Sequence, residues 1–374
     1  MSFLISIIPT LIVLGILILI HEFGHFIACR LTGVRVEKFS IGFGPEIFHW
    51  QGKETRYAIS LFPLGGFVKP AGESVSEVDA EGPKPGDYLA APIWARIVIV
   101  VAGVAMNYLL AYFLFVAIFV MGRPVPGTTI GGFVEGYPAK TSGLEVGDRI
   151  AQVNAQTVRT WNELTDAFQA APGKDLSLVV ERQNADQGRR QFPVQIAARI
   201  EMVKDIFGQS FEMKRLGITP HPEALEFESY GFGESIVKAW QTELFLTGMT
   251  YKALFYLILG KLSLKTMAGP IGIIAMTGTA AKLGLPYLLQ LTANLSVSLA
   301  VINLLPIPAL DGGHFLFLII EAIRRKRVSL AFQERVTQVG FVLLMALMVL
   351  ILYNDLVNIN AFEKIKGMIH FTKS

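Results

Sequence analysis

Four long stretches of the chain are almost purely apolar. Residues 1–20, 97–121, 283–310 and 336–353 contain no charged side chain. A helix needs about 20 apolar residues to cross roughly 30 Å of hydrocarbon. We therefore expect a membrane α-helical protein with about four transmembrane helices, of which the third is the most polar and the fourth the shortest.

The first apolar stretch does not have the features of a cleaved signal peptide. It lacks a positive n-region, and no small-residue cleavage site follows it. It runs directly into His-Glu-Phe-Gly-His at residues 21–25. We expect it to remain as a membrane helix.

The segments between the apolar stretches differ in character. Val34–Val68 alternates like strands and is rich in aromatic residues, which predicts a β-hairpin dipping toward the membrane. Beyond the second stretch, four short strands and one helix predict a folded module, at Thr129–Phe133, Arg149–Val153, Trp161–Ala170, Leu176–Glu181 and Gln191–Ile196. Glu234–Leu259 is apolar but interrupted by charges, which favours an amphipathic helix at the interface.

Basic residues predict the orientation in the membrane. The link between the third and fourth stretches contains Arg324, Arg325, Lys326, Arg327 and Arg335, which places it in the cytoplasm and the middle module outside. The expected order begins with a first helix (1–30), a cytoplasmic loop with a membrane-associated β-hairpin region (31–95) and a second helix (96–122). An inserted extracytoplasmic α+β domain with its extension (123–232) and an amphipathic helix with its connection (233–282) follow. The chain then continues with a third transmembrane segment (283–313), a basic loop (314–335) and a fourth helix with a tail (336–374).

Composition narrows the classes further. Hydrophobic residues make up 52% of the chain and charged residues 17%, which argues against a purely soluble protein. The net charge of +3 is too small and dispersed to indicate nucleic-acid binding. Cys29 is the single cysteine, so no internal disulfide stabilises the outside module.

The His-Glu-Phe-Gly-His segment is an H-E-x-x-H pattern, which is typical of zinc hydrolases. On a helix, residues four apart lie on one face about 5–6 Å from each other, so His21 and His25 can share one ion. Glu22 can take a proton from the hydrolytic water. A buried polar cluster between helices is the alternative, but ionisable groups in an uncharged membrane helix by default suggest function.

A third ligand must come from elsewhere in the chain. Asp311 is the only acid between Leu283 and Ile320, and flanking glycines give its carboxylate access. It could instead simply end a helix, and His314 is a competing ligand. Glu321 lies farther along, and we expect it to be a surface charge.

These motifs resemble the site-2 protease family of intramembrane metalloproteases, in particular its bacterial regulator-of-sigma-E type. The resemblance covers essentially the whole chain. It rests on HEFGH, on FSIGFGP at residues 39–45 and on NLLPIPALDGG at residues 303–313, with weaker matches at residues 103–107 and 267–272.

The resemblance implies that Asp311 is the third zinc ligand and that the active site lies in the membrane near its cytoplasmic side. It implies a bacterial inner-membrane enzyme that cleaves transmembrane segments of anti-sigma factors or remnant signal peptides. It also implies substrate-binding roles for Asn303, Pro306, Pro308 and Asn107, although helix packing and kinking would equally explain them.

The outside module resembles a PDZ domain through Gly136–Ala139, Gly143-Leu144, Gly147–Ile150 and Val153-Asn154. Such domains bind peptide termini by strand addition at a sheet edge. Many relatives carry two copies, whereas this chain shows one clear copy, so direct peptide capture and exclusion of bulky proteins both stay open.

Two other functions compete with proteolysis. A membrane scaffold could recruit partners through the module while a structural metal ties helices together, but structural zinc sites usually have four protein ligands and only three are evident. A zinc transporter would leave the peptide-binding module without a role.

Overall fold

The computed structural model describes residues 2–73, 82–184, 188–205, 207–263, 265 and 267–358. The chain forms two compact units, one made of residues 1–117 and 235–374 and the other of residues 118–234.

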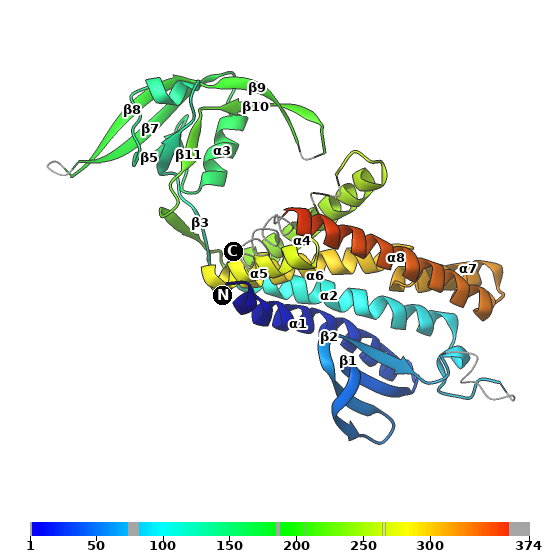
Figure 1. Cartoon of the computed structure of the whole chain (residues 1–374). Helices are drawn as coiled ribbons and strands as arrows, with labels where there is room; N and C mark the ends of the chain where they lie inside the picture. Colours follow the sequence, from blue (N-terminus) through cyan, green and yellow to red (C-terminus); the bar gives the residue numbers. More distant parts are fainter. Residues whose placement is uncertain are drawn as a thin grey trace, which may run out of the picture. The chain divides into compact units, whose positions relative to one another are not determined.

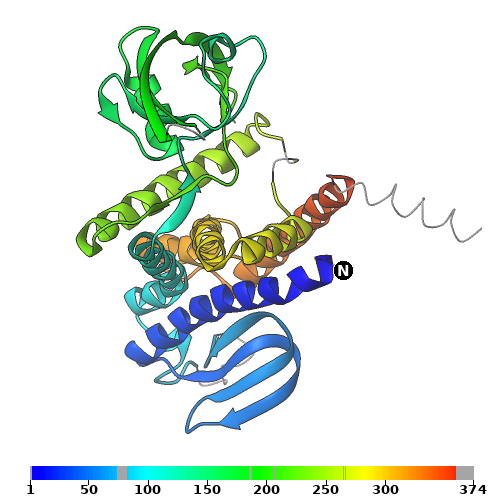
Figure 2. The same ribbon diagram turned by 90° about the vertical axis from the view of Figure 1, so that its left-hand side faces the viewer.

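The first unit is built around long helices (Figures 1 and 2). Over the described residues, four helices are long and apolar enough to cross a membrane. They are α1 (Ser2–Leu31), α2 (Ile93–Met121), α6 (Leu285–Leu304) and α8 (Leu330–Asn358). The four expected apolar helices are confirmed.

The predicted limits of the third and fourth segments were wrong. Helix α5 (Pro270–Leu283) ends where Gly284 adopts a φ of 115°, and α6 stops at Leu304, well before Leu310. The expected basic loop is largely helical, because α7 (Asp311–Arg324) and the start of α8 extend into it. Charge marks where the apolar environment ends, whereas a helix continues wherever its backbone hydrogen bonds can form.

Helix α8 is tied to α5 by a buried carboxylate. Asp355 accepts backbone hydrogen bonds from Gly269 (3.1 Å), Ile271 (3.0 Å) and Gly272 (3.0 Å). These N–H groups stand at the start of α5, where a helix has no internal acceptors. The remaining helix, α4 (Phe232–Ile258), agrees with the predicted amphipathic helix.

The expected hairpin is present as β1 (Val36–Gln51) and β2 (Arg56–Pro70). Residues 38–41 of β1 lie opposite both 66–69 and 56–59, so the two bent strands form a curled sheet. Its base packs on α1, where Ala28, Cys29, Val34 and Val36 share a core with Ile99 of α2. Its far part exposes large apolar side chains, namely Phe43, Ile47, Phe48, Trp50, Leu61 and Phe62.

The second unit is mostly strand. Its main sheet has the order β6-β5-β7-β8, and three further strand pairs are β3–β12, β4–β11 and β9–β10. The bounds are β3 (Arg123–Pro126), β4 (Ile130–Phe133), β5 (Arg149–Val153), β6 (Gln156–Thr157), β7 (Asp175–Asn184), β8 (Gly188–Ala197), β9 (Arg199–Lys204), β10 (Ser210–Arg215), β11 (Ile218–Pro220) and β12 (Leu225–Glu228).

The elements predicted for this module are confirmed as β4, β5, β7, β8 and α3 (Trp161–Ala170). A capping box between Thr160 and Glu163 starts α3, which satisfies backbone donors at the helix start. Strands β3, β6 and β9–β12 were not predicted, because each is short and pairs with a distant or equally short strand.

Candidate metal centre

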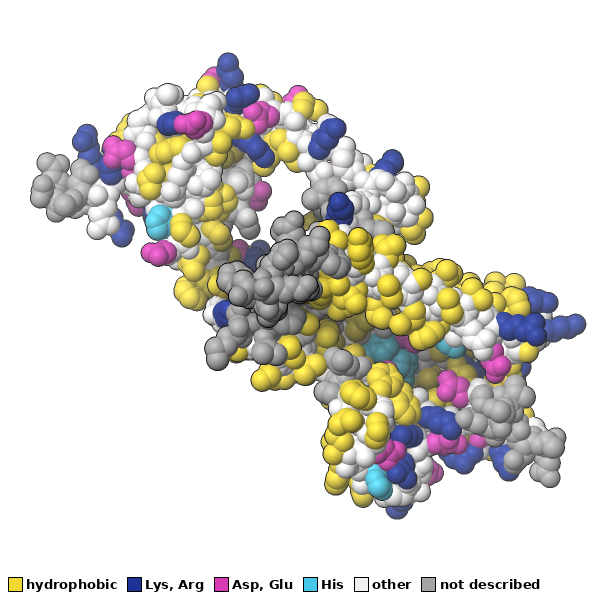
Figure 3. Space-filling model, viewed as in Figure 1, with side chains coloured by type: hydrophobic (Ala, Val, Ile, Leu, Met, Phe, Trp, Pro, Cys, Tyr) yellow, Lys and Arg dark blue, Asp and Glu magenta, His cyan; other side chains and the backbone are white. Residues whose placement is uncertain are grey.

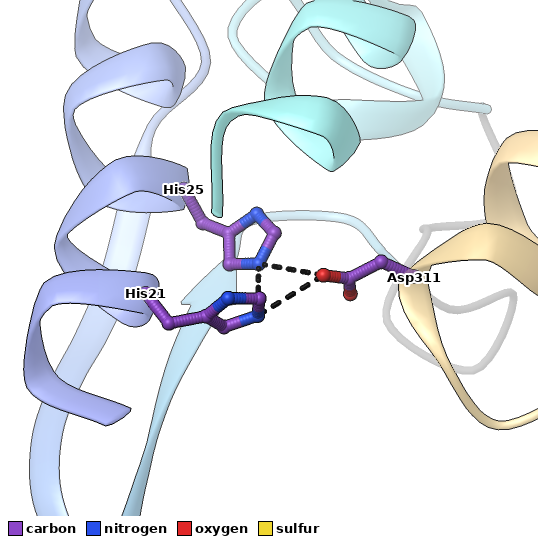
Figure 4. Close-up of side chains that lie close together, drawn as sticks. All are labelled: His21, His25 and Asp311. Atoms are coloured by element: carbon purple, nitrogen blue, oxygen red, sulfur yellow. Dashed lines mark hydrogen bonds and ion pairs between the residues drawn. The ribbon is translucent and has the colours of Figure 1, made fainter. Parts of the chain in front are cut away.

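Helix α1 carries both histidines on one face (Figure 4). The His21 and His25 ring centroids lie 4.8 Å apart with planes at 84°. Their side chains are only 9% and 15% exposed. The one-turn spacing thus presents two imidazoles to a single point, as the motif predicted.

The third group comes from the turn that joins α6 to α7. Asp311 begins α7, and Gly312 and Gly313 follow it directly. A Cβ at Gly312 would lie 2.0 Å from the Leu305 carbonyl oxygen, and one at Gly313 2.5 Å from that of Ile307. Only glycine allows the turn to fold this tightly against α7, so the sequence Asp-Gly-Gly fixes where the carboxylate points.

The three side chains meet at one point. His21 Nε2 lies 3.2 Å from His25 Nε2, and Asp311 Oδ2 lies 3.0 Å and 3.4 Å from these two nitrogens. Ligands about 2.0–2.1 Å from a tetrahedral zinc are separated from each other by about 3.3–3.4 Å. The triangle therefore has the size of one face of a zinc coordination tetrahedron.

Neighbouring groups set the orientation of both rings. The Ile99 carbonyl oxygen accepts a hydrogen bond from His25 Nδ1 at 2.8 Å, which leaves Nε2 free for a metal. The Asn107 carboxamide lies 3.3 Å from His21 Nδ1 and is fully buried. With its oxygen turned to the ring, Asn107 would accept the Nδ1 proton in the same way. Partners of this kind fix the tautomer of metal-binding histidines.

Small residues let α1 and α2 approach closely at this level. A Cβ on Gly24 would lie 2.4 Å from the Ala102 carbonyl oxygen, and one on Gly103 would lie 2.3 Å from His25 Nε2. Small residues are common where membrane helices touch. Gly103 in particular leaves the space that the imidazole needs.

Glu22 lies beside the three ligands but is held by a different element. Its Oε2 accepts a hydrogen bond from the Val68 backbone N–H of β2 at 3.1 Å. Gly66 lies along the same carboxylate, since its Cβ would be 3.3 Å from Glu22 Cγ. The hairpin thus fixes the group that the motif assigns to proton transfer.

The side chains of Glu22 and of the three candidate ligands line a cavity of about 500 Å³. Figure 3 shows histidine side chains in the hollow beneath α8. Tyr88 and His314 also line the cavity, and burial raises the pKa of the Tyr88 hydroxyl, which stays protonated. Among the described residues, the group able to hold a metal consists of His21, His25 and Asp311, without His314.

The other predicted site residues lie at different places around this centre. Asn303 Nδ2 is 3.5 Å from His21 Nε2, next to the ligand triangle. Pro306 and Pro308 belong to the turn before Asp311. Asn107 contacts the ligand His21 rather than open space. The substrate-binding roles of all four stay predictions.

The expectation that Glu321 is a surface charge was wrong. Glu321 is buried and accepts two hydrogen bonds from Arg96 of α2, at 2.6 Å and 3.1 Å. This pair borders the same cavity and joins α7 to α2. Sequence reasoning missed this pair because 225 positions separate the partners and because residues 314–335 were expected to form a loop.

Comparisons with known proteins agree with this geometry. The model of peptidase family M50 matches residues 9–347. Zinc metalloprotease RasP of Bacillus licheniformis is 31% identical, over 94% of this chain and 98% of the relative. A predicted zinc metalloprotease of Clostridium perfringens is 35% identical over 94% and 98% of the two chains, and one of Rhizobium meliloti 33% identical over 93% and 96%.

These matches run from the first membrane helix into the last and include every residue of the triangle. The resemblance drawn from the HEFGH and LDGG motifs is thereby confirmed. We conclude that this chain belongs to peptidase family M50 and is a zinc metalloendopeptidase of the site-2 protease type.

Proposed function

We propose that the enzyme hydrolyses peptide bonds within transmembrane segments, with zinc held by His21, His25 and Asp311 and with Glu22 as general base. The observation that carries this proposal is the ligand triangle of 3.0, 3.2 and 3.4 Å with Glu22 in the same cavity. Since His21 and His25 lie inside an apolar helix of membrane length, the reaction would take place within the bilayer.

The residues divide the chemistry between them. Zinc at this position would lower the pKa of a water toward about 7 and polarise the scissile carbonyl. Glu22 takes the proton from the attacking water and passes it to the leaving amine. The Val68 N–H holds the Glu22 carboxylate in place during both transfers. Three protein ligands leave a coordination position open, which is typical of catalytic rather than structural zinc.

A helical substrate hides its carbonyl groups in hydrogen bonds, so it must unwind before hydrolysis. Strand β2 contacts Glu22 through Val68, and the Pro-rich turn leads directly into the ligand Asp311, so both border the space around the metal centre. We assign the unwound substrate to this space, with Asn303, Pro306 and Pro308 as contacts. The exposed aromatic side chains of the hairpin support its insertion into the membrane.

We assign the substrates to single-span membrane proteins, such as an anti-sigma factor, and to remnant signal peptides. The basic end of α7 supports a cytoplasmic placement of that end, with the second unit outside the inner membrane. The second unit is proposed to be PDZ-like. Among the described strands, β11 pairs with β4 alone, which leaves its other edge for a peptide terminus.

The test compares wild type and Glu22→Gln in vesicles that contain a single-span substrate without its outer domain. Cleavage should fall by about 10²- to 10⁴-fold, while bound zinc is unchanged. Glu37→Gln, on the exposed part of the hairpin, is the matched control and should cleave normally. Full cleavage by Glu22→Gln would contradict the mechanism; zinc-loaded wild type that cleaves no such substrate would favour the scaffold.

A further inference from the structure

A second cavity lies on α8, away from the ligand triangle. This groove has a volume of about 600 Å³. Its walls are α8 and the turn before α7, and its lining consists of Ile307, Pro308, Phe332, Arg335, Val336, Val339, Gly340, Leu343, Leu344 and Leu347. Of these ten residues, eight carry apolar side chains, one is glycine and one is charged.

The groove follows from one close contact. A Cβ at Gly340 would lie 2.3 Å from the Pro308 carbonyl oxygen, so the turn touches α8 at this point. Beyond it α8 is poorly covered, and Val339 and Leu343 are 60% and 66% exposed. In a membrane protein, an open apolar groove on such a helix faces lipid chains.

Arg335 lies on the apolar face of α8 and not on the face that carries the other polar side chains. The polar residues of the same turns line the cavity of the metal centre, namely Gln333, Glu334, Thr337 and Gln338. Arg335 instead lies in the apolar row with Val336 and Val339. Among the described residues, no carboxylate lies within ion-pair distance of its guanidinium. A charge placed on an apolar row without a protein partner indicates a ligand with an anionic head and an apolar tail.

The dimensions fit such a ligand. No charged residue occurs from Val336 to Asn354, so Arg335 stands at the edge of the hydrocarbon layer. From Arg335 to Leu347 the helix rises about 18 Å, and one leaflet of hydrocarbon is about 15 Å thick. Arg324, in the last turn of α7, and Lys326, in the link to α8, are exposed and add positive potential near the start of α8, where Arg335 lies.

We propose that this groove binds one acyl chain of an anionic phospholipid whose phosphate is held by Arg335. Guanidinium groups suit phosphate because they donate paired hydrogen bonds. The wall formed by Ile307 and Pro308 leads directly into Asp311, so the bound chain supports the turn that presents this residue. The groove shares Pro308 with the proposed substrate contacts, but lipid binding itself requires no catalysis.

The experiment uses the full chain with Leu343→Trp as a reporter, since this exposed side chain lies in the groove. Vesicles contain equal amounts of phosphatidylglycerol and phosphatidylcholine, with brominated chains on one lipid at a time. The signal of the same protein without the reporter is subtracted to remove the four native tryptophans. Brominated phosphatidylglycerol should quench more strongly, corresponding to about a fivefold preference.

Arg335→Gln should remove this preference, whereas Lys326→Gln, which loses the same charge outside the groove, should keep it. Equal quenching by both lipids in the reporter protein would overturn the proposal. The site would also be overturned if the preference for phosphatidylglycerol survived Arg335→Gln, or if Lys326→Gln removed it equally. Either result would show a general attraction of the lipid to the basic surface. Displacement of the signal by a transmembrane substrate peptide on a Glu22→Gln background would assign the groove to substrate instead.

Discussion

Replacing Gly103 by alanine should weaken zinc binding much more than it weakens the fold. The added Cβ would lie 2.3 Å from His25 Nε2 and 2.9 Å from His21 Cε1. To restore a contact of about 3.5 Å, the His25 ring must move by roughly 1 Å. Its Nδ1 is held by the Ile99 carbonyl oxygen at 2.8 Å, so the ring cannot simply rotate away. Zinc sites tolerate ligand displacements of only about 0.2 Å.

Loss of the groups that hold a metal ligand in place typically lowers metal affinity by about 10- to 100-fold. We expect the zinc affinity of Gly103→Ala to fall by at least this factor. Crowding at this closely packed site costs about 1–3 kcal/mol, and the preference for alanine over glycine in a helix offsets about 1 kcal/mol of it. Thermal stability without metal should therefore fall by no more than about 2 kcal/mol. The assay is competition with a chelator, alongside thermal unfolding of the metal-free protein. Gly248→Ala in α4 is the control, because nothing lies within 4 Å of its added Cβ. Zinc binding by Gly103→Ala equal to wild type would refute the reasoning.

Three further predictions concern the framework around the site. Glu321→Leu leaves the buried Arg96 guanidinium unpaired and should destabilise by about 3–5 kcal/mol in thermal unfolding, whereas combining it with Arg96→Met should recover most of the loss. Asp355→Asn should weaken a charged helix cap by about 1.5–3 kcal/mol and speed amide exchange in the first turn of α5; unchanged exchange would contradict the role of the carboxylate. A hydrogen bond from Lys38 is the main reason that the pKa of Glu46 is lowered from 4.5 to about 2. Because the folded-state pKa is depressed, this stabilisation is present above pH 4.5 and is lost as the pH falls toward 2; limited proteolysis of the hairpin should increase over that window in wild type and stay flat in Glu46→Gln.

The four apolar helices and the histidine pair follow closely from local sequence, whereas the choice of Asp311 over His314 rests on the family resemblance. His21 and His25 are one turn apart in an apolar run, so any helix there must bring them together. The two glycines after Asp311 indicated that its carboxylate is accessible, and the structure adds that no side chain would fit at either position. The strands at Arg149–Val153 and the helix at Trp161–Ala170 were predictable because alternation and a capping box are visible locally.

The features that sequence reasoning missed depend on pairing between distant segments. Asp355 reads as an ordinary charge after the last apolar run, and only the fold shows that it caps a helix 84 positions earlier. Strand β12 is four residues long and has no strong pattern, but it pairs with β3 about 100 residues upstream. The helical state of the basic link could not be read from its charges, since charge reports on solvent and not on backbone hydrogen bonding.

The most direct test of the central claim is X-ray absorption at the zinc edge of the purified enzyme. Wild type should show two imidazole ligands and oxygen ligands at about 2.0–2.2 Å with no sulfur. Glu22→Gln should give the same protein ligands, and Asp311→Ala should lose zinc or one oxygen ligand. A spectrum that contains sulfur, or one that Asp311→Ala leaves unchanged, would contradict a site built from His21, His25 and Asp311.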